Sequence, residues 1–113
     1  MNNISGKVVD CSIEVHKTLG GPGLLESVYE EALVWELKSQ GLEVNRQVRL
    51  PICYKGQNIG QPLIMDLVVE NDVVVECKAT SQFNKIFESQ LFTYLRLSKK
   101  KLGLIINFGE TYL

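Results

Sequence analysis

The stretch Val73-Val74-Val75-Glu76-Cys77-Lys78 decides the fold, because its run of β-branched residues predicts a buried strand. Side chains alternate across a pleated sheet, so Glu76 and Lys78 should share one face, roughly 7 Å apart at about 3.3 Å per residue, with Cys77 facing the other way. A charged pair at the end of a buried strand is costly to desolvate unless something compensates. A metal ion with its bound water is one compensation, and a salt bridge is the other.

A second strand is predicted over residues 64–70, and Asn71-Asp72 is typical of a turn, so the two strands should form a hairpin. A two-residue turn would pair Asp66 with Cys77. A three-residue loop or a bulge sorts the apolar residues better, and we adopt it; it predicts an irregular turn over residues 70–73. One face then carries Met65, Leu67, Val69, Val73, Val75 and Cys77, and the other carries Asp66, Glu76 and Lys78.

Hydrophobic periodicity places helices and strands along the rest of the chain. The pattern predicts helices over residues 4–19 and 24–40, an edge strand over 44–54, a helix from the N-caps Thr80 or Ser81 to Ser98, and a last strand over 102–108. The second helix has an apolar stripe of Leu25, Val28, Tyr29, Ala32, Leu33 and Leu37, and the third has a face of Phe83, Phe87, Gln90, Leu91, Tyr94 and Leu97. The resulting α/β order is ααβββαβ. Since the third helix is a crossover, strand 73–78 and the last strand should be parallel within a mixed sheet.

Composition narrows the functional class. The 113 residues fit one domain, 1–113, and the net charge of −1 predicts no overall basic field for nucleic acid, so such binding must come from a local patch. The three cysteines are widely separated and lack metal-ligand spacing, which favours reduced thiols over a structural zinc site. No run of 18 apolar residues is present, so we expect no membrane span and a cytoplasmic location.

Asp66, Glu76 and Lys78 form the leading candidate site. Two carboxylates and a backbone carbonyl suit Mg²⁺ or Mn²⁺, and a lysine beside them could orient water for phosphodiester hydrolysis. The same spacing is equally compatible with a hairpin that carries an ordinary surface salt bridge.

Four other residues have both a structural and a functional interpretation. Glu26 lies in a first helical turn, where it either favours the helix dipole or points into the site. His16 either caps its helix or assists with phosphate or a proton. Tyr29 and Tyr94 are more typical of core aromatics with a hydrogen-bonded hydroxyl than of catalytic groups.

Asp66, Glu76 and Lys78 resemble the signature of the PD-(D/E)XK nuclease superfamily. The stretch Gly23-Leu24-Leu25-Glu26-Ser27-Val28-Tyr29 resembles the naming motif of its GxxExxY family. The resemblance extends to His16, to residues 90–94 and to residues 102–109. It implies a restriction-endonuclease-like core, in which a mixed four-stranded sheet is flanked by helices.

The resemblance also implies roles for individual residues. Asp66, Glu76 and the Cys77 backbone carbonyl are the expected metal ligands. Lys78 is expected to activate water, Glu26 to support the site, and Gln90 with Tyr94 to shape it. The leading hypothesis is a Mg²⁺-dependent nuclease acting on DNA, with a homodimer spanning a duplex left open. The alternatives are a noncatalytic binding or regulatory module with the same fold, and a purely structural dimer domain.

Overall fold

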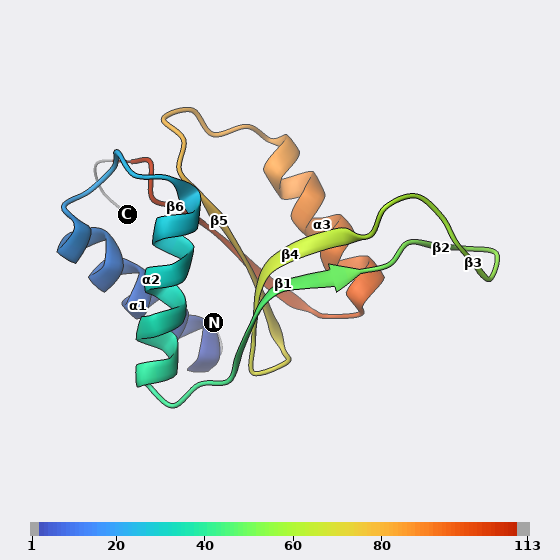
Figure 1. The fold of residues 1–113 in the computed structure, drawn as a ribbon, viewed down its shortest axis with the longest axis horizontal. Helices are drawn as coiled ribbons and strands as arrows, with labels where there is room; N and C mark the ends of the chain where they lie inside the picture. Colours follow the sequence, from blue (N-terminus) through green and yellow to red (C-terminus); the bar gives the residue numbers. More distant parts are fainter. Residues whose placement is uncertain (1–2, 111–113) are drawn as a thin grey trace.

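The computed structural model describes residues 3–110, in which helices cover both faces of a sheet. In Figure 1, α1 and α2 lie together on one side of the strands and α3 lies on the other. The elements are α1 (Asn3–Leu19), α2 (Glu26–Ser39), β1 (Val44–Leu50), β2 (Cys53–Tyr54), β3 (Gln57–Asn58), β4 (Leu63–Val69), β5 (Val73–Lys78), α3 (Ile86–Ser98) and β6 (Leu102–Asn107). The predicted α/β class with flanking helices is confirmed.

The main sheet has four strands in the order β1-β4-β5-β6. β4 pairs antiparallel with β1 and β5, whereas β5 and β6 run parallel, joined by the crossover helix α3. The mixed sheet and the parallel last pair are therefore confirmed, and β1 lies at the sheet edge as predicted. The central position of β5 explains why all five of its residues from Val73 to Cys77 are buried.

The hairpin between β4 and β5 has the predicted three-residue loop. Leu67 lies opposite Val75 and Val69 opposite Val73, leaving Glu70, Asn71 and Asp72 between the strands. Glu70 and Asn71 take left-handed conformations, with φ of 53° and 52°. Continuing this register by one residue places Asp66 opposite Glu76.

Two apolar cores lie on the two faces of the sheet, and Met65 belongs to a different one from that predicted. Leu67 packs with β5 and the helices α1 and α2, as expected, but Met65 packs with Val68, Val74 and Leu91 on the α3 side. The alternation of β4 is broken between Met65 and Leu67, and the neighbouring strand β1 breaks at Gln47, whose φ is 54°. A break in the pleat at the same level of both strands explains the error.

Two predicted boundaries are also corrected. The predicted edge strand ends at Leu50, because Pro51 interrupts the pairing, and the chain continues into a small projecting hairpin of β2 and β3 (Figure 1). α3 begins at Ile86 rather than after Thr80, whose hydroxyl instead accepts a hydrogen bond from the Gln82 amide.

The apolar faces of α2 and α3 are narrower than predicted. Leu25 precedes α2 and is 75% exposed, and Val28 is 37% exposed. In α3 the buried residue is Leu91, whereas Gln90 and Leu97 are exposed. Among residues 3–110, none of the helices is long and apolar enough to cross a membrane.

Candidate active site

The carboxylates of Asp66 and Glu76 lie where the β4–β5 ladder ends. Glu76 Oε2 accepts a hydrogen bond of 2.8 Å from the Asp66 amide, and Asp66 Oδ2 accepts one of 2.8 Å from the Cys77 amide. Each side chain thus bonds the backbone of the opposite strand, beyond the paired residues Leu67 and Val75. The loop of the hairpin sets the register, and the register brings the two acids together.

Glu76 is a buried acid next to a second acid. It is 5% exposed, and burial, followed by the negative charge of Asp66, raises its pKa from the ordinary 4.5 to about 8. The hydrogen bond from the Asp66 amide and the charge of Lys78 act in the opposite direction. The negative charge at this site is therefore only partly compensated by the protein.

The two carboxylates each keep one oxygen without a protein partner. Asp66 Oδ1 and Glu76 Oε1 accept no hydrogen bond from the described residues, since the amides of Cys77 and Asp66 occupy the other two oxygens. Within residues 3–110 no fully buried side-chain oxygen lacks a partner, so solvent must reach both free oxygens. Two solvent-accessible carboxylate oxygens are donors that a hard divalent cation accepts.

The side chains alone do not complete such a site. In the part of the chain that the structure describes, no three histidine, cysteine or acidic side chains converge in a way that could hold a metal ion. A cation bound between Asp66 and Glu76 would therefore keep several water ligands, as Mg²⁺ commonly does in proteins.

Lys78 lies near the acids but contacts an aromatic ring. Its Nζ atom is 4.6 Å from the centre of the Phe87 ring of α3. Of the described residues, only Arg46 and Glu30 form an ion pair within 4 Å, so the salt-bridge alternative for Lys78 finds no support here. The amine is held on the α3 side of the sheet and has no direct acid partner, which leaves it available to a substrate.

Cys77 faces away from the two acids. Its thiol is buried in the core beneath α1 and α2, and burial raises its pKa well above 9.0, with Asp66 and Glu30 adding to the effect. A thiol in such surroundings stays protonated and unreactive. The thiol is therefore unsuited to the site, and a role for the Cys77 backbone carbonyl stays a prediction.

Glu26 and Tyr29 belong to the same turn of α2, with different roles. Tyr29 is fully buried; its hydroxyl donates to the Gly21 carbonyl at 2.8 Å and accepts from the Leu24 amide at 3.1 Å. It thereby fixes the glycine turn that precedes α2. Glu26 is the exposed first residue of the helix, and no hydrogen bond or ion pair joins its carboxylate to another described residue.

No hydrogen bond or ion pair joins the remaining predicted residues, His16, Gln90 and Tyr94, to the two carboxylates within the described part of the chain. His16 is buried, and its Nε2 is 2.7 Å from the Glu110 carbonyl, a structural contact at the end of α1. Gln90 and Tyr94 line one hollow of about 200 Å³ beside α3. Burial, then the charges of Glu76 and Asp66, raise the pKa of the Tyr94 hydroxyl, which places Tyr94 within electrostatic reach of both acids.

Sequence reasoning missed the residues that fix the chain after β5. Asn107 Oδ1 accepts from the Thr80 amide at 3.1 Å and from the Gly109 amide at 2.9 Å, while its Nδ2 donates to the Thr80 carbonyl at 3.0 Å. A Cβ atom on Gly109 would lie 2.3 Å from the Thr80 backbone. The sequence did carry one signal for this role, because Asn107 is a single polar residue at the end of the apolar strand β6.

A second residue missed by the sequence analysis is Glu30, which is 6% exposed. It pairs with Arg46 at 3.3 Å and accepts a hydrogen bond of 2.7 Å from Gln47 Nε2. Its spacing from Leu33 and Leu37 matches the buried side of α2. An acid at core spacing was therefore a detectable signal.

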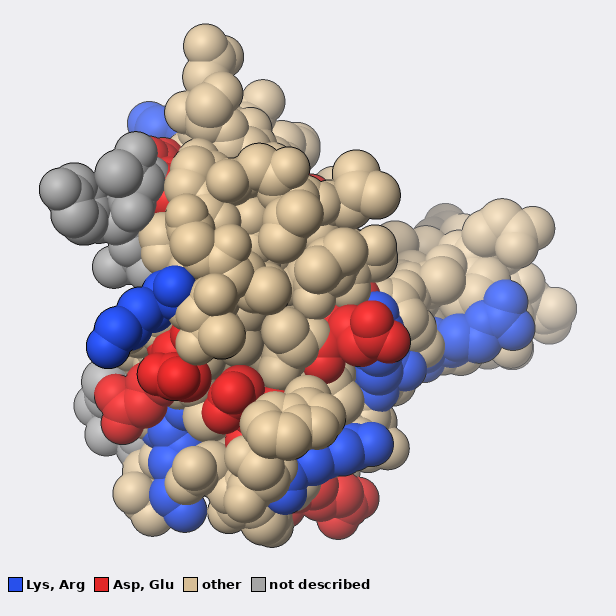
Figure 2. Space-filling view, turned by 60° about the vertical axis from the view of Figure 1, so that its left-hand side comes forward, with Lys and Arg blue, Asp and Glu red and all other residues tan. Residues whose placement is uncertain are grey.

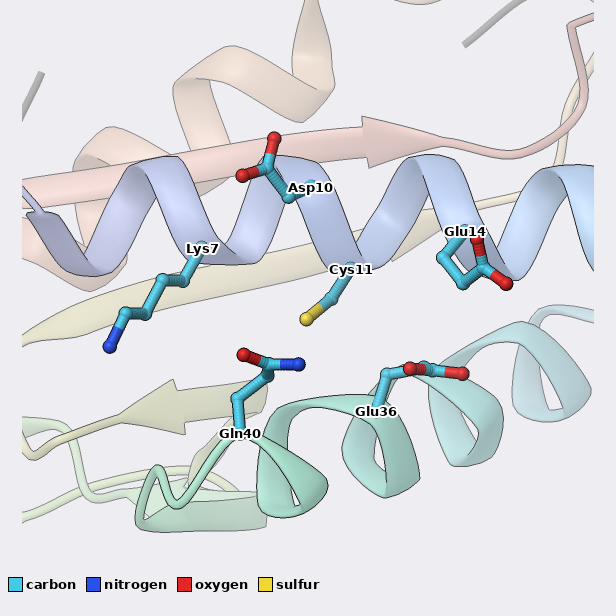
Figure 3. A pocket seen from close by; sticks show the side chains of 6 residues that line it. All are labelled: Lys7, Asp10, Cys11, Glu14, Glu36 and Gln40. Carbon is cyan, nitrogen blue, oxygen red and sulfur yellow. The ribbon is translucent and has the colours of Figure 1, made fainter.

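A separate hollow of about 450 Å³ lies between α1 and α2 and is lined by Lys7, Asp10, Cys11, Glu14, Glu36 and Gln40, of which Cys11 and Gln40 point toward each other across it (Figure 3). Burial, then the charges of Glu36 and Asp10, raise the pKa of the Cys11 thiol, so it is not an activated nucleophile. Figure 2 shows acidic and basic side chains interleaved on the lower part of the face on which α1 and α2 lie. Nothing in this hollow indicates a reaction.

Comparison with known proteins identifies a family for the chain. A family model described as the PD-(D/E)XK nuclease superfamily matches residues 2–113. No curated protein and no solved structure matched the chain. The match covers Asp66, Glu76 and Lys78, while the finer assignment to the GxxExxY family stays a prediction.

Proposed function

The chain belongs to the PD-(D/E)XK nuclease superfamily, and we propose that it is a Mg²⁺- or Mn²⁺-dependent nuclease that hydrolyses phosphodiester bonds in DNA. The observation that carries the proposal is the pair of free oxygens, Asp66 Oδ1 and Glu76 Oε1, beside a lysine without an acid partner. Divalent metals are in general use among such nucleases.

The residues present fit a divalent cation. Asp66, Glu76 and the Cys77 carbonyl would hold it, and its charge would offset the unfavourable burial of Glu76 next to Asp66. When bound, the cation supplies a water of lowered pKa and stabilises negative charge on a phosphate oxygen. Lys78 then orients the attacking water or a phosphate oxygen with its free amine. Tyr94 and Gln90 line a hollow beside α3, and their proposed role is to shape the site; Glu26, the first residue of α2, is proposed to support it.

The test combines metal binding with cleavage. Calorimetry should detect Mg²⁺ and Mn²⁺ binding to the wild type, and Asp66→Asn and Glu76→Gln should both lose it. Lys78→Gln should keep metal binding while the rate of cleavage of labelled DNA falls at least about 100-fold, the scale of losing one positioned catalytic group. Lys85→Gln, an exposed lysine before α3, is the matched control and should cleave as the wild type does.

Two outcomes would contradict the proposal. Cleavage that persists in purified Asp66→Asn would show that another site, or a contaminant, cuts the DNA. A folded wild type that binds neither metal nor DNA would favour the alternative of a noncatalytic module. RNA of the same sequence, tested in parallel, decides the substrate class, since preferential RNA cleavage would overturn the DNA assignment.

A further inference from the structure

Glu30 is a buried acid on α2 that bonds two consecutive residues of β1. Its Oε2 is 3.3 Å from the Arg46 guanidinium, and its Oε1 accepts a hydrogen bond of 2.7 Å from Gln47 Nε2. Arg46 also reaches the Ser27 carbonyl at 3.4 Å. Helix α2 is thus tied to the edge strand through one carboxylate.

Consecutive residues of a strand normally point to opposite faces. Arg46 and Gln47 instead both reach Glu30, so the alternation of β1 fails at this point. Gln47 has a φ of 54°, a left-handed conformation that costs a residue other than glycine roughly 1–2 kcal/mol. Both contacts to Glu30 are made at this strained residue or at the residue next to it.

The strained residue lies directly beside the candidate site. β1 pairs Arg46 with Leu67 and Val48 with Met65, and the register skips Gln47 and Asp66, which face each other between these pairs. Beyond the break, the side chains of both strands switch to the opposite face of the sheet. In β1, Val44 belongs to the core under α1 and α2, whereas Val48 packs on the α3 side; in β4, Leu67 and Met65 are divided in the same way. Asp66 therefore lies in the sheet at the single level where the β1–β4 ladder is interrupted.

We propose that Glu30 is a positioning residue for Asp66, acting through Gln47. By holding Gln47 in the left-handed conformation, Glu30 maintains the interruption opposite Asp66. In this position the Asp66 amide donates to Glu76 and the Asp66 carboxylate accepts from the Cys77 amide. The second carboxylate oxygen, Oδ1, then stays free beside Glu76. This inference rests on the proposed function in one respect: that Asp66, once positioned, is a metal ligand.

The experiment tests whether Asp66 keeps its place through two readouts, one in metal-free protein and one with added metal. Amide hydrogen exchange by NMR in metal-free protein reports the bond from the Asp66 amide to Glu76, and calorimetry with Mn²⁺ reports the ligand site. Glu30→Ala should speed exchange at Asp66 at least about 10-fold and weaken Mn²⁺ binding at least about 10-fold. Glu30→Gln keeps an oxygen acceptor for Gln47 and should restore Asp66 exchange to within about 3-fold of the wild type.

Two further variants separate this role from general stability. Glu36→Ala, on the same helix but in the hollow between α1 and α2, is the matched control and should leave both readouts unchanged. Gln47→Leu removes the donor but leaves Glu30 paired with Arg46, so it tests the same link if Glu30→Ala does not fold. Its Asp66 exchange should rise as in Glu30→Ala.

Unchanged Asp66 exchange in folded Gln47→Leu would overturn the inference, as would equal losses in Glu30→Gln and Glu30→Ala. The exchange readout needs no metal. If the wild type binds no Mn²⁺ but Asp66 exchange responds as expected, the proposed function fails and the positioning role stands. If the wild type binds Mn²⁺ but neither readout responds to these variants, the positioning role fails and the proposed metal site stands.

Discussion

Glu76 shows how one residue links the stability of this protein to its chemistry. Burial and the adjacent charge of Asp66 both favour its protonated form, and the pKa of about 8 means that much of it is protonated at neutral pH without a cation. A buried acid of this kind destabilises the fold whenever it must ionise. Perturbed acids cluster at functional sites because function, rather than stability, maintains them.

The raised pKa predicts an unusual pH dependence of stability. The folded state holds the Glu76 proton up to about pH 8, whereas the unfolded chain releases it near 4.5. The stabilisation from this group is therefore complete below about pH 4.5 and is lost as pH rises to about 8. In EDTA, the free energy of unfolding from urea titrations should fall over this window by an amount on the order of a few kcal/mol relative to Glu76→Gln.

The matched control for that prediction is Glu88→Gln, at an exposed position in the first turn of α3. It should follow the wild-type pH profile. If Glu76→Gln shows the same fall as the wild type between pH 4.5 and 8, Glu76 ionises normally and the electrostatic account of the site is wrong.

At the scale of elements, the glycine turn before α2 depends on a tertiary hydrogen bond. Gly20, Gly21 and Gly23 all have positive φ, which suits glycine, but such freedom leaves the turn without a preferred shape. The Tyr29 hydroxyl supplies that shape by bonding Gly21 and Leu24, and the Tyr29 ring stacks on Phe108 with centroids 4.7 Å apart. These contacts of Tyr29 fix the position of the start of α2, where Glu26 lies.

Tyr29→Phe should therefore loosen the turn while leaving the core intact. The ring stack on Phe108 is retained, and the lost hydroxyl bonds should cost about 1–2 kcal/mol of unfolding free energy, measured by urea titration. Tyr54→Phe, which alters a 56% exposed tyrosine of β2, should change it by less than about 0.5 kcal/mol. Equal effects of the two changes would show that the Tyr29 hydroxyl does not hold the turn.

For the whole molecule, the site lies where the layers meet at the end of the central strand. β5 is covered by α1 and α2 on one face and by α3 on the other (Figure 1), and Glu76 and Lys78 lie at its C-terminal end. On the proposed function, a cation bound by Asp66 and Glu76 would join β4 to β5 beyond the last ladder pair. Metal binding and global stability should therefore be coupled.

This coupling predicts stabilisation by metal. At a free Mg²⁺ or Mn²⁺ concentration about 100 times the Kd, the free energy of unfolding should increase by about 2.7 kcal/mol over its value in EDTA. Asp66→Asn should lose this increase, and Asp10→Asn, an exposed acid on α1, should keep it. Stabilisation of Asp66→Asn to the same extent would place the bound ion elsewhere in the molecule.

The sequence by itself determined the α/β class, the crossover that makes β5 and β6 parallel, and the hairpin register. Local patterns are sufficient for these features, because alternation fixes the faces of β5 and only one loop length places its apolar residues together with Leu67 and Val69. The same register brought Asp66 opposite Glu76, so the core of the candidate site was predictable from spacing alone.

Tertiary structure alone decided the break opposite Asp66, the burial of Glu30, and the approach of Gly109 to Thr80. These features join residues distant in sequence: Glu30 Oε1 and Gln47 are 17 positions apart, and Asn107 and Thr80 are 27 apart. Periodicity describes one element at a time, and it assigned Met65 to the wrong core for that reason. A left-handed Gln47 is unfavourable locally, so only the carboxylate of a packed helix explains why the chain adopts it.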